Sequence, residues 1–192
     1  MHGRRDPIIT PVALLEALSF AADRHRNQRR KDVEASPYIN HPIAVATVLA
    51  VDGRVTDPVL LVGAILHDTL EDTETSVAEL ENRFGPEVAR LVEEVTDDER
   101  LPAPERKRLQ VERAPHATIA AKQLKVADKI CNVRDVTGAP PARWSRERRR
   151  AYLEWTAQVV AGCRGVNPAL ERVYDEALAQ GRRRLEEEGQ AG

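Results

Sequence analysis

The chain has 192 residues, a formal net charge of −2 and 42% hydrophobic residues, so it can bury the core of a single domain. Only 4% of the residues are aromatic and alternating β-branched runs are scarce, which disfavours a β-sandwich or barrel and favours an all-α fold. The longest apolar run, residues 59–66, is far shorter than the roughly 20 residues that a membrane-spanning helix needs. The near-neutral charge gives no general attraction to nucleic acid. Membrane and nucleic-acid partners are therefore not expected.

No secretion signal is visible, because the N-terminus lacks an apolar stretch ahead of a small-residue cleavage site. We therefore expect a cytoplasmic protein. Cys131 and Cys163 are 32 residues apart and form no CxxC motif, so they are predicted to be small buried groups without a functional role. The expected organisation is an N-terminal tail over residues 1–9, one helical domain over 10–180 and a C-terminal tail over 181–192.

Helical spacing of apolar residues begins after Thr10 and Pro11, which is typical of a cap followed by a first-turn proline. A charged loop over residues 28–40 follows, and a second helix is expected to start at Pro42. A nearly all-apolar helix is then predicted from Val59 to about Leu70, of the kind that is buried at the centre of a bundle.

The rest of the chain continues as helices, which gives a predicted bundle of about eight to ten. Asp128 faces inward in this pattern, where a bare carboxylate is costly. The arginine-rich run over 146–150 is interrupted by Glu147 and is predicted to be a solvated face. The further helices are expected over residues 77–84, 86–95, 105–113 and 117–136, after Ser145, and from Asn167 to a fraying end over 182–188.

Four ionisable residues crowd the end of the apolar helix. His67, Asp68, Glu71 and Asp72 stand at positions i, i+1, i+4 and i+5, so a continuous helix would stack His67 beneath Glu71 and Asp68 beneath Asp72. Burying such groups without a cation is expensive, and a divalent metal ion is the economical explanation.

Two imidazoles and two carboxylates are available to one cation: His41, His67, Asp68 and Asp128. Because no thiolate is among them, Mn²⁺, Fe²⁺ or Zn²⁺ would suit this set, with positions left for water and a phosphate oxygen. Such an arrangement is typical of a phosphohydrolase.

A purely structural interpretation of the same residues stays open at this point. His41 then caps its helix, and His67 is a core histidine whose hydrogen bonds are satisfied. Asp128 then pairs with a basic neighbour, which is Lys125, Lys129 or Arg134.

Six ordered segments make the chain similar to the HD-domain hydrolases of the RelA/SpoT group, and most of all to the small, standalone metazoan SpoT homologues. The resemblance covers roughly residues 10 to 178. The segments are Gln-Arg-Arg-Lys-Asp at 28–32, Pro-Tyr-Ile-Asn-His-Pro at 37–42, Leu-His-Asp-Thr-Leu-Glu-Asp-Thr at 66–73, Phe-Gly at 84–85, Val-Thr-Asp-Asp at 95–98 and Lys-Val-Ala-Asp-Lys-Ile-Cys-Asn-Val-Arg-Asp at 125–135.

This resemblance implies an all-α, Mn²⁺-dependent enzyme that removes the 3′-pyrophosphate from ppGpp or pppGpp and leaves GDP or GTP. It implies that the metal ligands are His41, His67, Asp68 and Asp128. It implies that Glu71 and Asp72 activate or orient the attacking water. It also implies substrate contacts: Arg30 stacks on guanine, Lys31, Asn132 and Tyr152 contact the ribose or phosphates, and Arg29 lies close enough to assist.

Two departures from the family pattern bear on the substrate. Glu99 and Ala103 stand where close relatives carry lysines, in a loop expected near the phosphates. The departures keep open the alternative that the chain is an HD-domain phosphohydrolase that acts on another nucleotide, such as NADPH at its 2′-phosphate. The alternative of another class is a non-catalytic, nucleotide-sensing helical module.

Overall fold

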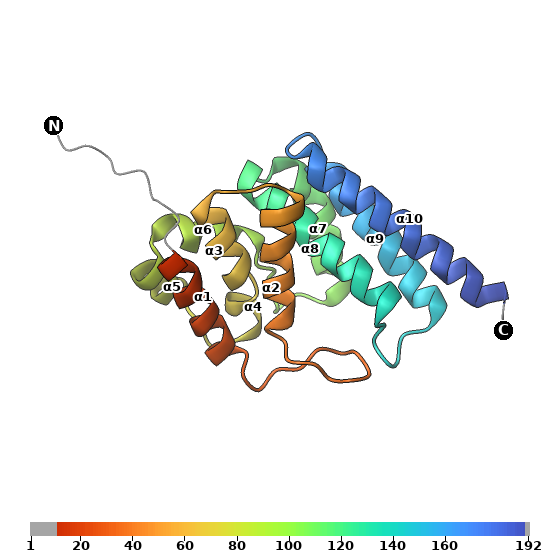
Figure 1. Ribbon diagram of the computed structural model, residues 1–192, viewed down its shortest axis with the longest axis horizontal. Helices are drawn as coiled ribbons and strands as arrows, with labels where there is room; N and C mark the ends of the chain where they lie inside the picture. The colour runs from red at the N-terminus through yellow and green to blue at the C-terminus, as the bar shows by residue number, and fades with distance from the viewer. Residues whose placement is uncertain (1–10, 191–192) are drawn as a thin grey trace.

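The structure, a computed structural model, describes residues 11–190, and these residues form helices and no strand. Thr10, the expected first cap, lies outside the described residues. No helix within the described range is both long and apolar enough to cross a lipid bilayer. The elements, drawn in Figure 1, are α1 (Pro11–Arg24), α2 (Asn40–Thr47), a π-helical turn (Val48–Asp52), α3 (Pro58–Leu66), α4 (Thr69–Asp72), α5 (Val77–Phe84), α6 (Pro86–Val95), α7 (Ala103–Arg113), a 3₁₀ turn (Ala114–His116), α8 (Ile119–Gly138), α9 (Arg146–Cys163) and α10 (Pro168–Gln190). The all-α prediction is confirmed.

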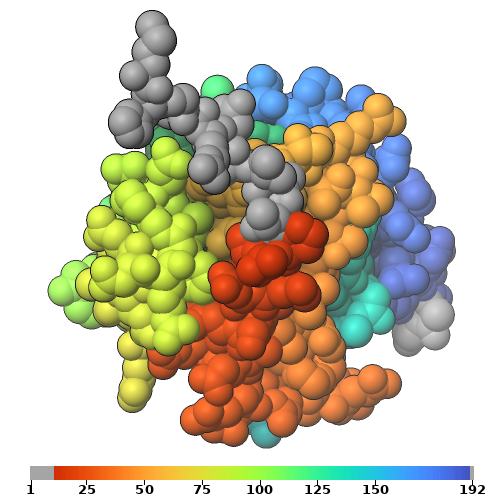
Figure 2. All heavy atoms as spheres, turned by 60° about the vertical axis from the view of Figure 1, so that its left-hand side comes forward, coloured from red at the N-terminus to blue at the C-terminus, as the bar shows by residue number. Residues whose placement is uncertain are grey.

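The helices form two groups around two hydrophobic clusters. Figure 1 shows α8, α9 and α10 running side by side, with α1, α3, α5 and α6 on the opposite side of the molecule. Helix α2 lies between the groups and contacts both α3 and α8. Figure 2 shows α1 at the surface, between the segment of α5 and α6 and the loop that follows α1.

Helix α3 joins the two clusters. Asp57 caps it by accepting a hydrogen bond from the backbone N–H of Val59 at 2.9 Å, and every residue from Leu60 to Leu66 is buried. Leu60, Leu61 and Ala64 belong to one cluster, whereas Val62, Ile65 and Leu66 belong to the other. The C-terminal end of α3 therefore lies in the middle of the molecule, between the two clusters.

The apolar helix is shorter than the sequence predicts. It ends at Leu66 rather than near Leu70, and His67 and Asp68 form a turn before the short helix α4. Two side chains account for the break: His67 Nδ1 donates to the carbonyl oxygen of Ala64 at 2.8 Å, and Thr69 Oγ1 donates to that of Leu66 at 2.7 Å. These bonds take up carbonyl groups at the helix end. The expected stacking of His67 beneath Glu71 in one continuous helix is therefore wrong.

The C-terminal helix is longer than predicted. The fraying expected over 182–188 is not observed, since α10 continues to Gln190 and buries Leu185. Arg149 also departs from the solvated face expected for its run, because it is buried and its guanidinium pairs with the carboxylate of Glu188. A long-range ion pair of this kind leaves no signal in local sequence. Cys131 and Cys163 are buried free thiols, as predicted.

Candidate active site

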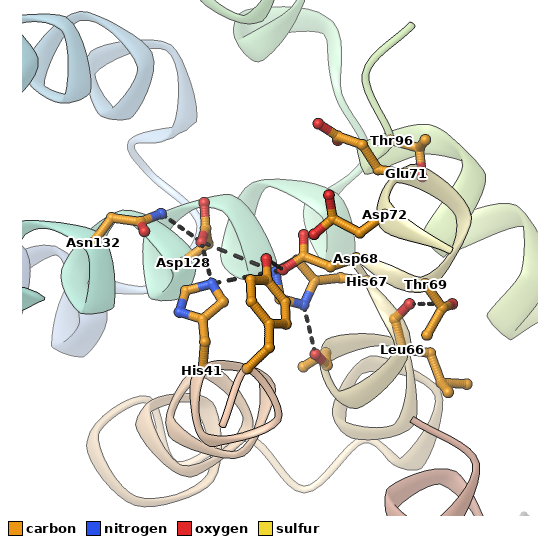
Figure 3. A network of polar contacts seen from close by, with 12 residues as sticks. His41, Leu66, His67, Asp68, Thr69, Glu71, Asp72, Thr96, Asp128 and Asn132 are labelled. Atoms are coloured by element: carbon orange, nitrogen blue, oxygen red, sulfur yellow. Dashed lines mark hydrogen bonds and ion pairs between the residues drawn. The ribbon is translucent and has the colours of Figure 1, made fainter. Parts of the chain in front are cut away.

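Three separate parts of the chain bring the predicted metal ligands together. His41 stands in the first turn of α2, His67 and Asp68 follow the end of α3, and Asp128 lies in the middle of α8. One ligand atom each from His41, His67 and Asp128 lies within 4.8 Å of the others. Asp68 is adjacent, with its Oδ2 atom 3.1 Å from His67 Nε2 and 3.8 Å from His41 Nε2. Figure 3 shows these side chains converging.

Hydrogen bonds orient both imidazoles. Because His67 Nδ1 donates to the backbone of Ala64, its Nε2 atom faces Asp68 and Asp128. This Nε2 atom is buried, and the Asp68 oxygen 3.1 Å away pairs with it by charge without the alignment of a hydrogen bond. His41 Nε2 lies 3.1 Å from Asp128 Oδ1. Backbone anchoring of one ring nitrogen is the usual way in which a protein presents the other nitrogen to a metal ion.

The charges of the cluster stabilise one another. Burial opposes the charge of His67, but the carboxylates of Asp68 and Asp128 outweigh it and raise the pKa of His67 to about 9. Burial likewise opposes ionisation of Asp68, but His67 and His41 hold the pKa of Asp68 below its ordinary value. For Asp128, Lys129 and His41 outweigh burial and hold the pKa well below the ordinary value. Without an ion, the site is thus a buried set of ion pairs.

These residues fit a divalent metal ion. A neutral His67 turns the Nε2 lone pair toward two carboxylates, and only a cation or a proton satisfies such a group. Two imidazole nitrogens and carboxylate oxygens from two aspartates are ordinary ligands of first-row divalent metals. The chemistry of the donors therefore supports a metal ion at this position.

Asp128 also pairs with a basic neighbour, as the structural interpretation proposed. Of the three candidates it is Lys129 that pairs, with Nζ 2.9 Å from Asp128 Oδ2. Asp128 Oδ1 is near His41 and accepts a hydrogen bond from Asn132 Nδ2 at 2.6 Å. The ion pair therefore engages one oxygen of Asp128, and the other oxygen faces the histidines. The two interpretations are compatible.

Tyr38 is a site residue to which the sequence assigned no role. Its hydroxyl donates to Asp68 Oδ2 at 2.6 Å, and burial together with the neighbouring carboxylate raises its pKa well above the ordinary value. Tyr38 stays protonated and thus orients the carboxylate of Asp68. The sequence feature that could have indicated this role is the position of Tyr38 within Pro-Tyr-Ile-Asn-His-Pro, three residues before His41.

Glu71 and Asp72 lie in α4 but in different surroundings. Glu71 Oε2 accepts a hydrogen bond from the backbone N–H of Asp97 at 3.2 Å, and its Oε1 lies 3.2 Å from an Arg106 guanidinium nitrogen. Burial raises the pKa of Glu71 to about 7, despite the hydrogen bond from Asp97, and the negative charges of Asp97, Asp68 and Asp72 act in the same direction as burial. Asp72 is exposed and accepts a hydrogen bond from Gln28 Nε2 at 2.9 Å. Arg106 and Gln28 are further contacts that the sequence analysis did not find.

Two adjoining cavities hold the predicted site residues. The first, here called the substrate cavity, has a volume of about 360 Å³, and the second, the metal cavity, has a volume of about 210 Å³. They share six lining residues: Arg30, Tyr38, Asp68, Glu71, Asn132 and Tyr152. Arg29, Lys31 and Asp72 line the substrate cavity, and His41, His67 and Asp128 line the metal cavity. Glu99 and Ala103 line neither cavity.

The substrate cavity combines cations with aromatic rings. The Arg30 guanidinium pairs with Asp135 and lies 5.7 Å from the centre of the Tyr38 ring. The Tyr152 ring lies between Trp144 and Trp155, at centroid distances of 5.3 and 5.2 Å. Flat aromatic surfaces beside guanidinium groups suit a nucleobase and its phosphates.

Known proteins are similar to this chain in sequence and in fold. The HD domain family model matches residues 17–160. A relative from Homo sapiens, named guanosine-3′,5′-bis(diphosphate) 3′-pyrophosphohydrolase MESH1, is 54% identical over 167 residues, which cover 87% of this chain and 93% of the relative. The bifunctional (p)ppGpp synthase/hydrolase SpoT of Escherichia coli strain K12 is 32% identical over 184 residues, which cover 90% of this chain but 25% of that protein.

A solved structure is similar as well. It is reported under the words "A metazoan ortholog of SpoT hydrolyzes ppGpp and plays a role in starvation responses", and its TM-score with this chain is 0.86. The two sequences are 46% identical, and the match covers 89% of this chain and 96% of the other. The chain therefore belongs to the HD domain family, in the branch of the metazoan SpoT homologues.

Proposed function

We propose that the chain is a metal-dependent hydrolase of guanosine-3′,5′-bis(diphosphate), ppGpp, and of pppGpp, which releases GDP or GTP and pyrophosphate. The observation that carries this proposal is the buried convergence of His41, His67, Asp68 and Asp128 beside a cavity lined by arginine, lysine and aromatic side chains. The names of the relatives at 54% and 32% identity support the same substrate. The cytoplasmic location stays a prediction.

One Mn²⁺ ion is proposed as the cofactor, held by His41, His67, Asp68 and Asp128. A divalent ion in this position supplies Lewis-acid stabilisation of phosphate oxygens and makes water a stronger acid. The protein side of the centre is rigid, because Tyr38 holds Asp68 and the backbone of Ala64 holds His67.

Glu71 is proposed as the base that accepts the proton of the attacking water. Its raised pKa, about 7, suits a group that takes and returns a proton near neutral pH. The water oxygen bonds to the phosphorus that is attached to ribose O3′, the bond between this phosphorus and O3′ breaks, and O3′ receives a proton. Pyrophosphate thereby gains the water oxygen, and the ribose keeps O3′. Asp72, exposed and held by Gln28, orients the water.

The substrate cavity is proposed to bind the nucleoside. Arg30 stacks on guanine, and its pair with Asp135 fixes the guanidinium beside Tyr38. Asn132 and Tyr152 line both cavities, which supports the proposal that they contact the ribose and the phosphate next to the reacting bond. The exposed side chains of Arg29 and Lys31 are proposed to meet the outer phosphates.

The test is reconstitution of the metal-free protein. Purified protein is stripped of metal, Mn²⁺ is added, and ppGpp is followed by anion-exchange chromatography. We expect Mn²⁺-dependent release of GDP and pyrophosphate, which Asp68→Ala abolishes. Asp175→Ala, which removes an exposed carboxylate outside both cavities, serves as the matched control and is expected to keep full activity.

The alternatives are separate outcomes of the same experiment. If ppGpp persists and Mn²⁺ instead drives release of inorganic phosphate from NADPH, the substrate assignment is wrong and the hydrolase class stands. Nucleotide binding without any metal-dependent product would identify a sensing module. Glu99 and Ala103 line neither cavity, so an effect of these departures on the choice of substrate would act from outside the two cavities.

A further inference from the structure

A third cavity adjoins the metal cavity on the side away from the substrate cavity. It has a volume of about 230 Å³ and lies between the end of α6, α7 and the beginning of α8. It shares Gln110 and Lys125 with the metal cavity and no lining residue with the substrate cavity. We call it the exit cavity.

The three cavities follow one another along α8. Lys125, Asp128, Asn132 and Asp135 stand at positions i, i+3, i+7 and i+10, which places them on one face of the helix. At about 1.5 Å per residue they span about 15 Å along the helix axis. Asn132 and Asp135 line the substrate cavity, Asp128 lines the metal cavity, and Lys125 stands where the metal cavity meets the exit cavity.

Cations line the exit cavity at both its inner and its outer end. Lys125 is largely buried, and burial together with the neighbouring Lys129 lowers its pKa. Among residues 11–190, no carboxylate oxygen lies within 4 Å of the Lys125 ammonium, whereas Lys129 has Asp128 at 2.9 Å. Arg113 and His116 line the exit cavity as exposed side chains, and neither forms an ion pair within the described range.

The two carboxylates of the exit cavity are already engaged. Glu94 accepts hydrogen bonds from the backbone N–H and the hydroxyl of Thr118, both at 2.7 Å. Asp97 Oδ2 accepts a hydrogen bond from Gln110 Nε2 at 2.6 Å. The other atom of that amide, Gln110 Oε1, is buried and has no hydrogen-bond partner in the described part of the chain. Neither carboxylate has a cation within 4 Å among residues 11–190, so their charges offset those of Lys125 and Arg113. The groups that the cavity leaves unused are the N–H donors of Lys125 and Arg113, which have no hydrogen-bond acceptor in the described range.

We propose that the exit cavity binds inorganic pyrophosphate, with Lys125 at the inner end and Arg113 at the outer end. The inference rests on the proposed function, in which the reaction leaves a nucleotide in the substrate cavity and a pyrophosphate anion at the metal. The nucleotide blocks the way back for the anion. An adjoining cavity in which the N–H donors of Lys125 and Arg113 have no acceptor gives the anion a separate binding site, and the exposed Arg113 marks its way out to solvent.

Equilibrium binding of pyrophosphate tests the proposal. Sodium pyrophosphate is titrated by calorimetry into the full chain loaded with one equivalent of Mn²⁺, without nucleotide. The decisive variant is Arg113→Glu, because Arg113 is exposed and outside the metal cavity. Arg183→Glu is the matched control, since Arg183 is exposed on α10, has no ion pair in the described range, and undergoes the same change of charge.

We expect Arg113→Glu to weaken pyrophosphate binding about tenfold or more, the loss typical of one charge-assisted contact. Arg183→Glu should bind pyrophosphate as the unchanged chain does, and GDP should bind equally well to all three proteins. Lys125→Met should weaken pyrophosphate binding similarly, because it removes the ammonium group and keeps an unbranched apolar side chain that is only one atom shorter. Thermal unfolding shows whether Lys125→Met is folded. If Lys125→Met is not folded, the result for Arg113→Glu alone decides the test.

Pyrophosphate binding that Arg113→Glu leaves unchanged would overturn the proposal, because the anion would then bind at the metal alone. The readout does not depend on turnover. If pyrophosphate binding depends on Arg113 but ppGpp is not hydrolysed, the proposal for the exit cavity stands and the proposed function is refuted. If ppGpp is hydrolysed but pyrophosphate binding does not depend on Arg113, the proposed function stands and the proposal for the exit cavity is refuted.

Discussion

Metal binding should release a proton from His67. In the metal-free protein the pKa of this imidazole is raised to about 9, because Asp68 and Asp128 outweigh the effect of burial, so the ring is protonated at pH 7. A metal ion needs the Nε2 lone pair and must displace this proton. We therefore expect close to one proton released per Mn²⁺ ion bound at neutral pH.

The size of the pH effect follows from the pKa. With a pKa of about 9, the apparent affinity for Mn²⁺ should rise by about 75-fold between pH 6.5 and 8.5, which is about 2.6 kcal/mol. The stability of the metal-free protein should change in the opposite direction and fall as the pH rises. Since the pKa is raised from 6.5, the protonated ring stabilises the fold below pH 6.5, and this contribution is lost as the pH rises toward 9.

Calorimetric titration of Mn²⁺ in two buffers of different ionisation enthalpy measures the released proton directly. Thermal unfolding with EDTA and with Mn²⁺ measures the two stabilities across the same pH range. The difference in melting temperature between the two samples should widen as the pH rises from 6.5 to 8.5. Equal binding enthalpies in the two buffers, together with a constant affinity, would refute the assignment of His67 as a protonated group that becomes a ligand.

Three further predictions concern the base, the packing and the nucleoside contact. The hydrolysis rate should rise with pH as Glu71 ionises, and Glu71→Gln should lose at least about 100-fold in turnover at unchanged metal content, measured by steady-state kinetics and elemental analysis. Gly162→Ala should destabilise the fold by about 1–2 kcal/mol in chemical unfolding, because the added Cβ would lie 2.9 Å from the Pro115 ring; Gly138→Ala, with its nearest atom at 3.5 Å, should not. Arg30→Ala should raise KM for ppGpp about tenfold through loss of the stacking partner, with metal affinity unchanged.

The fold class was predictable because local signals agree along the chain. Asp57, Ser76 and Ser145 each accept a hydrogen bond from the first turn of the helix that follows, and aspartate and serine are residue types favoured at this capping position. The break after Leu66 was not predictable from apolar periodicity. It depends on the hydrogen bonds that His67 and Thr69 donate to backbone carbonyls, and both residues also fit a continuous helix.

In the candidate site, too, the residues were predictable from the sequence and the contacts that orient them were not. Motif residues such as His41, His67 and Asp128 were identified from residue type and resemblance, and the structure brings them together. The contacts that orient the site join distant segments: Arg106 reaches Glu71 across 35 positions, and Tyr38 reaches Asp68 across 30. Contacts of this kind depend on how helices pack, so spacing within one helix carries no signal for them.

The position of the centre links catalysis to the stability of the whole fold. His67 follows a helix whose residues belong to both hydrophobic clusters, and the hydrogen bond from Nδ1 to the carbonyl oxygen of Ala64 ties its buried ring to that helix. Rigid placement of this kind favours a preorganised metal site, but it also buries charged groups whose separation from water is costly. In the metal-free protein this cost is offset by ion pairs in which His67 carries a proton. In the proposed centre a metal ion would replace that proton as the cation of the site, and for this reason metal affinity and metal-free stability are expected to change together with pH.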